Sequence, residues 1–109
     1  MGSGTTLVEA KLLNRNAVGV DINPQSVSIS ETNLQFQCET NSKIFTRNGN
    51  ATSLYFIKDS RIDFICTHPP YANIIKYSKG IEGDISLLGV DEFLVDMCKV
   101  ANESLKKKK

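Results

Sequence analysis

Hydrophobic residues in the first half of the chain fall into short groups whose spacing predicts alternating helices and strands. Residues 2–4 form a Gly-Ser-Gly turn, and the partly apolar spacing that follows predicts a helix over about residues 5–14. Residues 17–21 are short and rich in β-branched side chains, which is typical of a buried strand. Asn23 has the features of an N-cap and a proline follows it, so a second helix is expected over about residues 24–38.

The second half of the chain predicts further strands and one long helix. The expected elements are a strand over 43–47, a turn over 48–50, a short helical turn over 51–56, a buried strand over 61–66, a loop from 71 to about 89, and a helix over 91–105. Strands that alternate with helices favour a parallel sheet. The expected fold is therefore α/β, a Rossmann-like arrangement with helices flanking an incomplete parallel sheet.

The start of the sequence bears on this fold. A glycine-rich turn of this kind normally leaves the end of a strand, but here the chain begins at the turn. The other end likewise stops where a further strand would be expected. We therefore expect residues 1–109 to form one partial domain, with the missing strands elsewhere in a longer chain or in a partner chain.

Composition is that of a soluble globular protein, with 40% apolar and 23% charged residues. The sequence has no apolar run of membrane-spanning length and no signal-peptide pattern, so we expect a cytoplasmic protein without a membrane segment. Three scattered cysteines, Cys38, Cys66 and Cys98, form no C-x-x-C pair, which favours reduced thiols, some of them buried, over a disulfide or a metal site.

Charge argues mildly against a long nucleic-acid footprint. The formal net charge is +1, and because Lys106–Lys109 contribute +4 of it, the other residues together carry −3. A nucleic-acid-binding domain usually has a basic face. The lysine run itself is expected to be a solvated chain end.

The turn at residues 2–4 and the acidic residue Asp21 form a candidate cofactor site. Glycines permit close approach to a ligand, and the helix N-terminus that follows offers free N–H groups to an anion. Asp21 ends the next strand, 17 residues after Gly4, where a carboxylate can accept hydrogen bonds from ribose hydroxyls. Leu7 stands where a dinucleotide fingerprint has its third glycine, which disfavours NAD, and the P-loop lysine is also absent. An ordinary glycine-rich turn is the alternative.

A second candidate site is the segment from Thr67 to Tyr71, which has the sequence Thr-His-Pro-Pro-Tyr. Two prolines make a rigid, extended loop after an expected strand, where open α/β sheets bind ligands. Tyr71 offers a ring on which a base can stack. A proline-rich loop without a ligand remains the alternative.

Together the two motifs resemble those of the amino-methyltransferases that form N4-methylcytosine or N6-methyladenine in DNA, which carry a G-S-G-T-T motif and a D/N/S-P-P-Y/F loop. The resemblance implies that the cofactor is S-adenosyl-L-methionine, that the substrate is DNA, and that no metal takes part. The cofactor contacts it implies are Gly2, Ser3, Gly4, Thr5, Thr6, Asp21, Ile22, Asn50, Ala51 and Thr67, and the catalytic residues are His68, Pro69, Pro70 and Tyr71. Asn50, Thr5 and Thr6 have plain turn and helix-start roles as alternatives.

The chemistry of the family gives each loop residue a role. By resemblance, the His68 side chain and the Pro69 carbonyl accept hydrogen bonds from the exocyclic NH2 group, while Tyr71 stacks on a base flipped out of the duplex. His68 departs from the usual Asp, Asn or Ser. A neutral imidazole has one acceptor nitrogen and a protonated one has none, so the target base stays open.

Three alternatives remain. Residues 72–80 include Lys76, Tyr77 and Lys79, which could contact nucleic acid, form a lid, or be solvated. An RNA guanine N2-methyltransferase uses a similar proline-proline loop, and a non-catalytic fragment is also consistent with the sequence. A target-recognition region is not visible, so sequence specificity is expected to lie outside this chain.

Overall fold

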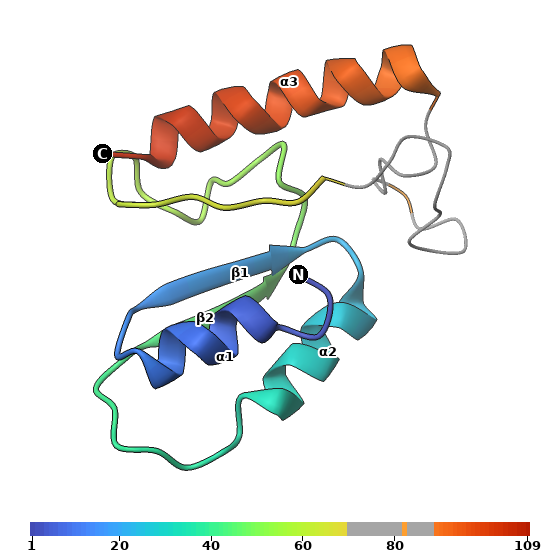
Figure 1. Ribbon diagram of the computed structural model, residues 1–109. Helices are drawn as coiled ribbons and strands as arrows, with labels where there is room; N and C mark the ends of the chain where they lie inside the picture. Colours follow the sequence, from blue (N-terminus) through green and yellow to red (C-terminus); the bar gives the residue numbers. More distant parts are fainter. Residues whose placement is uncertain (70–81, 83–88) are drawn as a thin grey trace. The chain divides into compact units, whose positions relative to one another are not determined.

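The chain divides into two compact units, Met1–Gly49 and Asn50–Lys109. The computed structural model describes residues 1–69, 82 and 89–109 (Figure 1). The helices and strands in these residues are α1 (Thr5–Leu12), β1 (Ala17–Asp21), α2 (Pro24–Asn33), β2 (Ile44–Asn48) and α3 (Val90–Lys107).

The N-terminal unit is built on a parallel pair of strands, as the sequence predicts. β1 pairs with β2 in a register that places Ala17 beside Ile44 and Asp21 beside Asn48. Parallel strands need a crossover connection, and α2 supplies it (Figure 1). This part of the expected α/β fold is present, with two strands in the sheet.

Both helices of this unit pack on one face of the sheet. A Cβ atom built on Gly19 would lie 2.6 Å from the Leu7 side chain of α1, so only glycine lets the helix approach this closely. Thr46, the register partner of Gly19, donates a hydrogen bond of 2.6 Å from Oγ1 to the Glu31 carboxylate of α2. The opposite face carries Val18, which is 41% exposed.

The two helices end earlier than their apolar spacing predicts. α1 stops at Leu12 rather than residue 14, where Asn14 takes a left-handed conformation with φ of 57°. α2 stops at Asn33 rather than residue 38. Lys11 of α1 explains why α2 ends early, because its Nζ donates to the carbonyls of Leu34 at 2.7 Å and Phe36 at 2.8 Å. A side chain from another helix thus replaces the hydrogen bonds that a longer α2 would have made.

The start of α2 confirms its sequence signal. The Asn23 side chain accepts a hydrogen bond of 2.9 Å from the backbone N–H of Gln25, and Pro24 follows as the first helical residue. Asparagine satisfies an N–H group that would otherwise lack a partner, and proline has none to satisfy at that position.

In the C-terminal unit, α3 confirms the helix expected over 91–105 and extends it at both ends. Its last carbonyls are capped by a distant segment: the Ser60 N–H donates to Lys106 at 3.0 Å, and the Arg61 and Ile62 N–H groups both donate to Lys107 at 2.9 Å. The backbone of residues 60–62 therefore supplies donors to a helix end that has no partners of its own.

This capping also explains why the buried strand predicted over 61–66 is wrong. In the described residues the segment has one isolated parallel bridge, between Ile62 and Lys108, and no continuous ladder. Phe64 is 79% exposed. The apolar residues of segment 61–66 have the pattern of a strand, but the segment lies beside the end of α3, and a helix end cannot extend a sheet.

Three smaller predictions also need correction. Residues 51–56 form turns rather than a helical turn. The lysine run is not a solvated chain end throughout, since α3 continues to Lys107 and buries that side chain. All three cysteines are free, as expected, but none is buried. Among the described residues no helix is long and apolar enough to span a membrane.

Candidate cofactor-binding site

The glycine-rich turn has the geometry that its composition suggests. The Gly4 N–H donates to the Met1 carbonyl at 3.0 Å, which closes a tight turn directly before α1. Gly2 and Gly4 both have positive φ, 58° and 83°, which side-chain-bearing residues rarely adopt. Both glycines are therefore required by the backbone, and the exposed Thr5 and Thr6 begin the helix behind them.

The helix that follows the turn begins without a side-chain cap. The N-cap residue Gly4 provides no side-chain hydrogen bond to the first N–H groups of α1, and no acidic residue lies in the first turn of the helix. Such N–H groups carry partial positive charge and suit an anionic partner. The start of α1 could therefore take the carboxylate of a bound cofactor.

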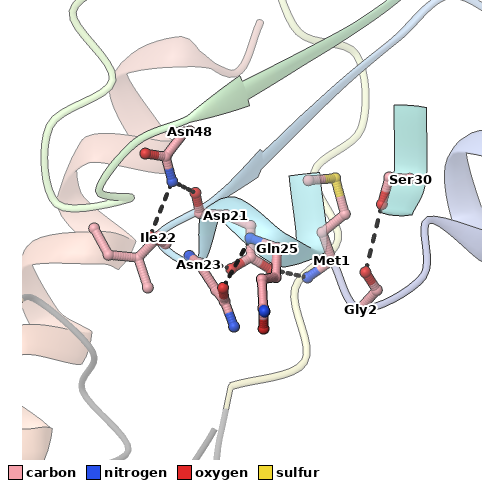
Figure 2. A network of polar contacts seen from close by, with 8 residues as sticks. All are labelled: Met1, Gly2, Asp21, Ile22, Asn23, Gln25, Ser30 and Asn48. Carbon is pink, nitrogen blue, oxygen red and sulfur yellow. Dashed lines mark hydrogen bonds and ion pairs between the residues drawn. The ribbon is translucent and has the colours of Figure 1, made fainter. Parts of the chain in front are cut away.

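Asp21 lies beside the turn, as its position at the end of β1 predicts. Its Oδ2 accepts a hydrogen bond of 2.7 Å from the Met1 ammonium group, and its Oδ1 accepts one of 2.9 Å from the Asn23 N–H (Figure 2). The Asp21 side chain is 17% exposed. The structure thus brings the first turn of the chain and the acidic residue together, with the carboxylate receiving donors on both oxygens.

The segment after Asp21 is held by a residue that the sequence did not single out. Asn48, at the end of β2, donates from its side-chain amide to the Asp21 carbonyl at 3.0 Å and to the Ile22 carbonyl at 2.9 Å (Figure 2). The Gly49 N–H also donates to the Asp21 carbonyl, at 3.0 Å. The only sequence signal was the place of Asn48 at the end of the next parallel strand, which brings it to the same edge of the sheet as Asp21.

Two polar residues of α2 contact the turn and were also missed. Ser30 donates from Oγ to the Gly2 carbonyl at 3.4 Å, and Asn33 donates from Nδ2 to the Ser3 carbonyl at 2.9 Å. Neither Ser30 nor Asn33 belongs to either of the two motifs in the sequence. The spacing of three residues, which places both side chains on one helix face, was the available signal.

The remaining predicted site residues belong to the C-terminal unit or lie outside the described residues. Asn50 uses its side-chain oxygen within its own turn, accepting from the Thr52 N–H at 3.0 Å and the Thr52 hydroxyl at 2.8 Å. These contacts support the role of a turn residue, the alternative given above. Ala51 is half-buried beside it.

The proline-proline loop is described only in part. Thr67 and His68 are exposed, and Pro69 is half-buried. Pro70, Tyr71 and the following loop with Lys76, Tyr77 and Lys79 lie outside the described residues. Within residues 1–69, 82 and 89–109, no group of three or more His, Cys, Asp and Glu side chains is placed to hold a metal ion.

Comparison with known proteins gives one match. A family model described as DNA methylase matches residues 1–32. The matched segment contains the glycine-rich turn, Asp21 and Ser30, and ends within α2. No curated protein and no solved structure matches the chain. The first 32 residues are thus similar to DNA methylases, which supports that family for part of the chain.

Proposed function

We propose that this chain binds S-adenosyl-L-methionine at one edge of the sheet, where the glycine-rich turn lies beside Asp21. We propose further that it transfers the methyl group of this cofactor to an exocyclic amino group of a DNA base, either N4 of cytosine or N6 of adenine. The observation that carries the proposal is the juxtaposition of the turn with Asp21, inside the segment that is similar to DNA methylases.

The residues at this edge fit the chemistry of the cofactor. Asp21 accepts hydrogen bonds from the Met1 ammonium group and the Asn23 N–H, and a carboxylate can likewise accept them from ribose hydroxyls. A side chain added at Gly2 would meet nothing within 4 Å, so the turn is open to a ligand on that side. The uncapped start of α1 suits the carboxylate of the methionyl group. Bound here, the cofactor would supply an electrophilic methyl group.

The catalytic assignment rests on the resemblance of the proline-proline loop. An exocyclic amine is a poor nucleophile because its lone pair is delocalised into the ring. In the proposal, the His68 imidazole and the Pro69 carbonyl accept hydrogen bonds from this amine and so direct the lone pair towards the methyl donor, while Tyr71 stacks on the flipped base. His68 must be neutral for this role, since a protonated imidazole has no acceptor nitrogen.

Cofactor binding is the first test. Titration calorimetry of the full chain with S-adenosyl-L-methionine is expected to give a dissociation constant in the micromolar range. Asp21→Asn keeps the shape of the side chain but removes its charge, and we expect binding roughly 10- to 100-fold weaker, the range for a hydrogen bond to a charged group. Asp63→Asn, at an exposed carboxylate of the other unit, is the matched control and should bind as the wild type does. Absence of binding by the wild type would refute the proposal.

Methyl transfer is the second test. The full chain is incubated with labelled S-adenosyl-L-methionine and either DNA or RNA, and the modified nucleosides are identified by mass spectrometry. We expect N4-methylcytosine or N6-methyladenine from DNA, and loss of product in Pro69→Ala and Tyr71→Ala. If methylated guanine in RNA were the sole product, RNA would be the substrate and the proposal of a DNA substrate would be wrong. Cofactor binding without any product would assign the chain a non-catalytic role.

A further inference from the structure

Ser30 and Asn33 of α2 hold two consecutive carbonyl groups of the glycine-rich turn. Ser30 is fully buried, and its hydroxyl donates to the Gly2 carbonyl at 3.4 Å (Figure 2). Asn33 is exposed, and its amide donates to the Ser3 carbonyl at 2.9 Å. The two residues lie one helical turn apart, so one face of α2 contacts the turn at both points.

These contacts fix the direction of the peptide groups in the turn. In a trans peptide the N–H group points away from the C=O group, and the described residues contain no cis peptide bond. Because the Gly2 carbonyl faces Ser30, the N–H of Ser3 points away from α2. Free N–H groups at the start of α1 follow within two residues. The α2 contacts therefore orient a donor towards the side where α2 does not lie.

Ser30 also limits how far the turn can move. A Cβ atom at Gly4 would lie 2.7 Å from both the Cβ and the Oγ of Ser30, so backbone and side chain are already in close contact. A larger residue at position 30 would displace the turn, and alanine would keep the packing while leaving the Gly2 carbonyl without this donor. Serine is thus suited in size and chemistry to its place.

We infer that Ser30 and Asn33 are positioning residues for the cofactor: they hold the turn at residues 2–4 so that the Ser3 N–H group and the start of α1 face S-adenosyl-L-methionine. The inference rests on the proposed function. Both side chains donate to carbonyls of the turn, so in this proposal they act through the turn. Their removal should weaken cofactor binding without unfolding the N-terminal unit, since Asn33 is exposed and Ser30→Ala preserves the contact with Gly4.

The test compares cofactor affinity in Ser30→Ala, Asn33→Ala and Thr32→Ala of the full chain. We expect binding two- to tenfold weaker in each of the first two, the range of one hydrogen bond, and wild-type binding in the third. Thr32 is the matched control because it is an exposed residue of the same helix whose hydroxyl donates within α2, to the Ser28 carbonyl.

An NMR measurement separates positioning from a general loss of stability. The amide signals of Ser3 and Thr5 are expected to shift in Ser30→Ala and Asn33→Ala and to respond less to added S-adenosyl-L-methionine, while the urea midpoint of unfolding stays near that of Thr32→Ala. If the wild type binds the cofactor and both variants bind equally well, the inference is overturned and the proposed function stands. If the wild type does not bind, both are overturned.

Discussion

The Nζ atom of Lys107 lies 2.6 Å from Oδ1 of Asp59, although the Lys107 side chain is only 8% exposed. The Glu103 carboxylate, one turn earlier on α3, lies 3.9 Å from the same Nζ. Glu103 also accepts a hydrogen bond of 2.9 Å from the Leu54 N–H. A buried ammonium group is stable only when it is paired, and these carboxylates pair it while joining residues 54–59 to the end of α3.

Lys107→Met should loosen this junction. Methionine retains the apolar stem but removes the charge, which leaves Asp59 and Glu103 without a buried partner. We expect the melting temperature to fall by about 4–8 °C and amide hydrogen exchange of Arg61 and Ile62 to become faster, because both donate to the Lys107 carbonyl. Lys108→Met is the control, at an exposed neighbour. Equal melting temperatures for the two variants would contradict the prediction.

Acid should weaken the same junction. Hydrogen bonding and charge interaction with Lys107 lower the pKa of Asp59 below its ordinary value of 3.8. The Leu54 N–H first, and then Lys106, lower the pKa of Glu103 below 4.5. Because the folded pKa lies below the unfolded pKa in both cases, the stabilisation is present above the unfolded values and is lost as pH falls through the folded ones.

The pH prediction is tested by following the carboxyl carbon signals of Asp59 and Glu103 by NMR between pH 6 and pH 2, a range that extends on the order of two units to either side of the ordinary pKa values. We expect both midpoints below those of an unfolded reference in urea. In Lys107→Met the Asp59 midpoint should return towards its ordinary value, whereas Glu103 should keep most of its shift through Leu54. An unchanged Asp59 midpoint in the variant would refute the assigned cause.

Gly4→Ala should destabilise the N-terminal unit. Gly4 has φ of 83°, and an added Cβ would lie 2.7 Å from Ser30. The left-handed conformation alone costs a non-glycine residue about 1–2 kcal/mol, and the collision adds to it. Urea unfolding should therefore show a loss of at least about 1 kcal/mol. Gly89→Ala is the control, with φ of −64° and nothing within 4 Å of its added Cβ, and should change little.

Asn48→Ala should alter the position of Asp21 more than the stability of the unit. The variant loses hydrogen bonds to the carbonyls of Asp21 and Ile22, but Asn48 is exposed, so water can replace part of them. We expect a loss of stability of about 1 kcal/mol and a several-fold weaker affinity for S-adenosyl-L-methionine. Asn41→Ala is the control, because there the backbone N–H makes the contact with Asn14. If Asn48→Ala bound S-adenosyl-L-methionine as tightly as the wild type, Asn48 would have no part in cofactor binding.

The local pattern of the sequence determined much of the N-terminal unit. The β-branched run at residues 17–21 predicted β1 with the bounds observed, and Asn23 with Pro24 predicted the start of α2. Both signals are local, since strand preference and N-capping depend on residues near in sequence. Two glycines before α1 likewise indicated a sharp turn, and both have positive φ in the structure. The match to DNA methylases falls on these same residues.

Tertiary structure decided what local pattern could not. Lys11 ends α2 from another helix, and Asn48 holds the Asp21 carbonyl from another strand. Residues 61–66 have the apolar composition of a strand, but their neighbour is a helix end, and Arg61 and Ile62 cap it instead. Each of these outcomes depends on a partner more than 20 residues away, and a polar or apolar side chain carries no local sign of such a partner. The sequence thus determined the turn, the first strand and the N-cap of the N-terminal unit, whereas the fold decided which distant residues meet.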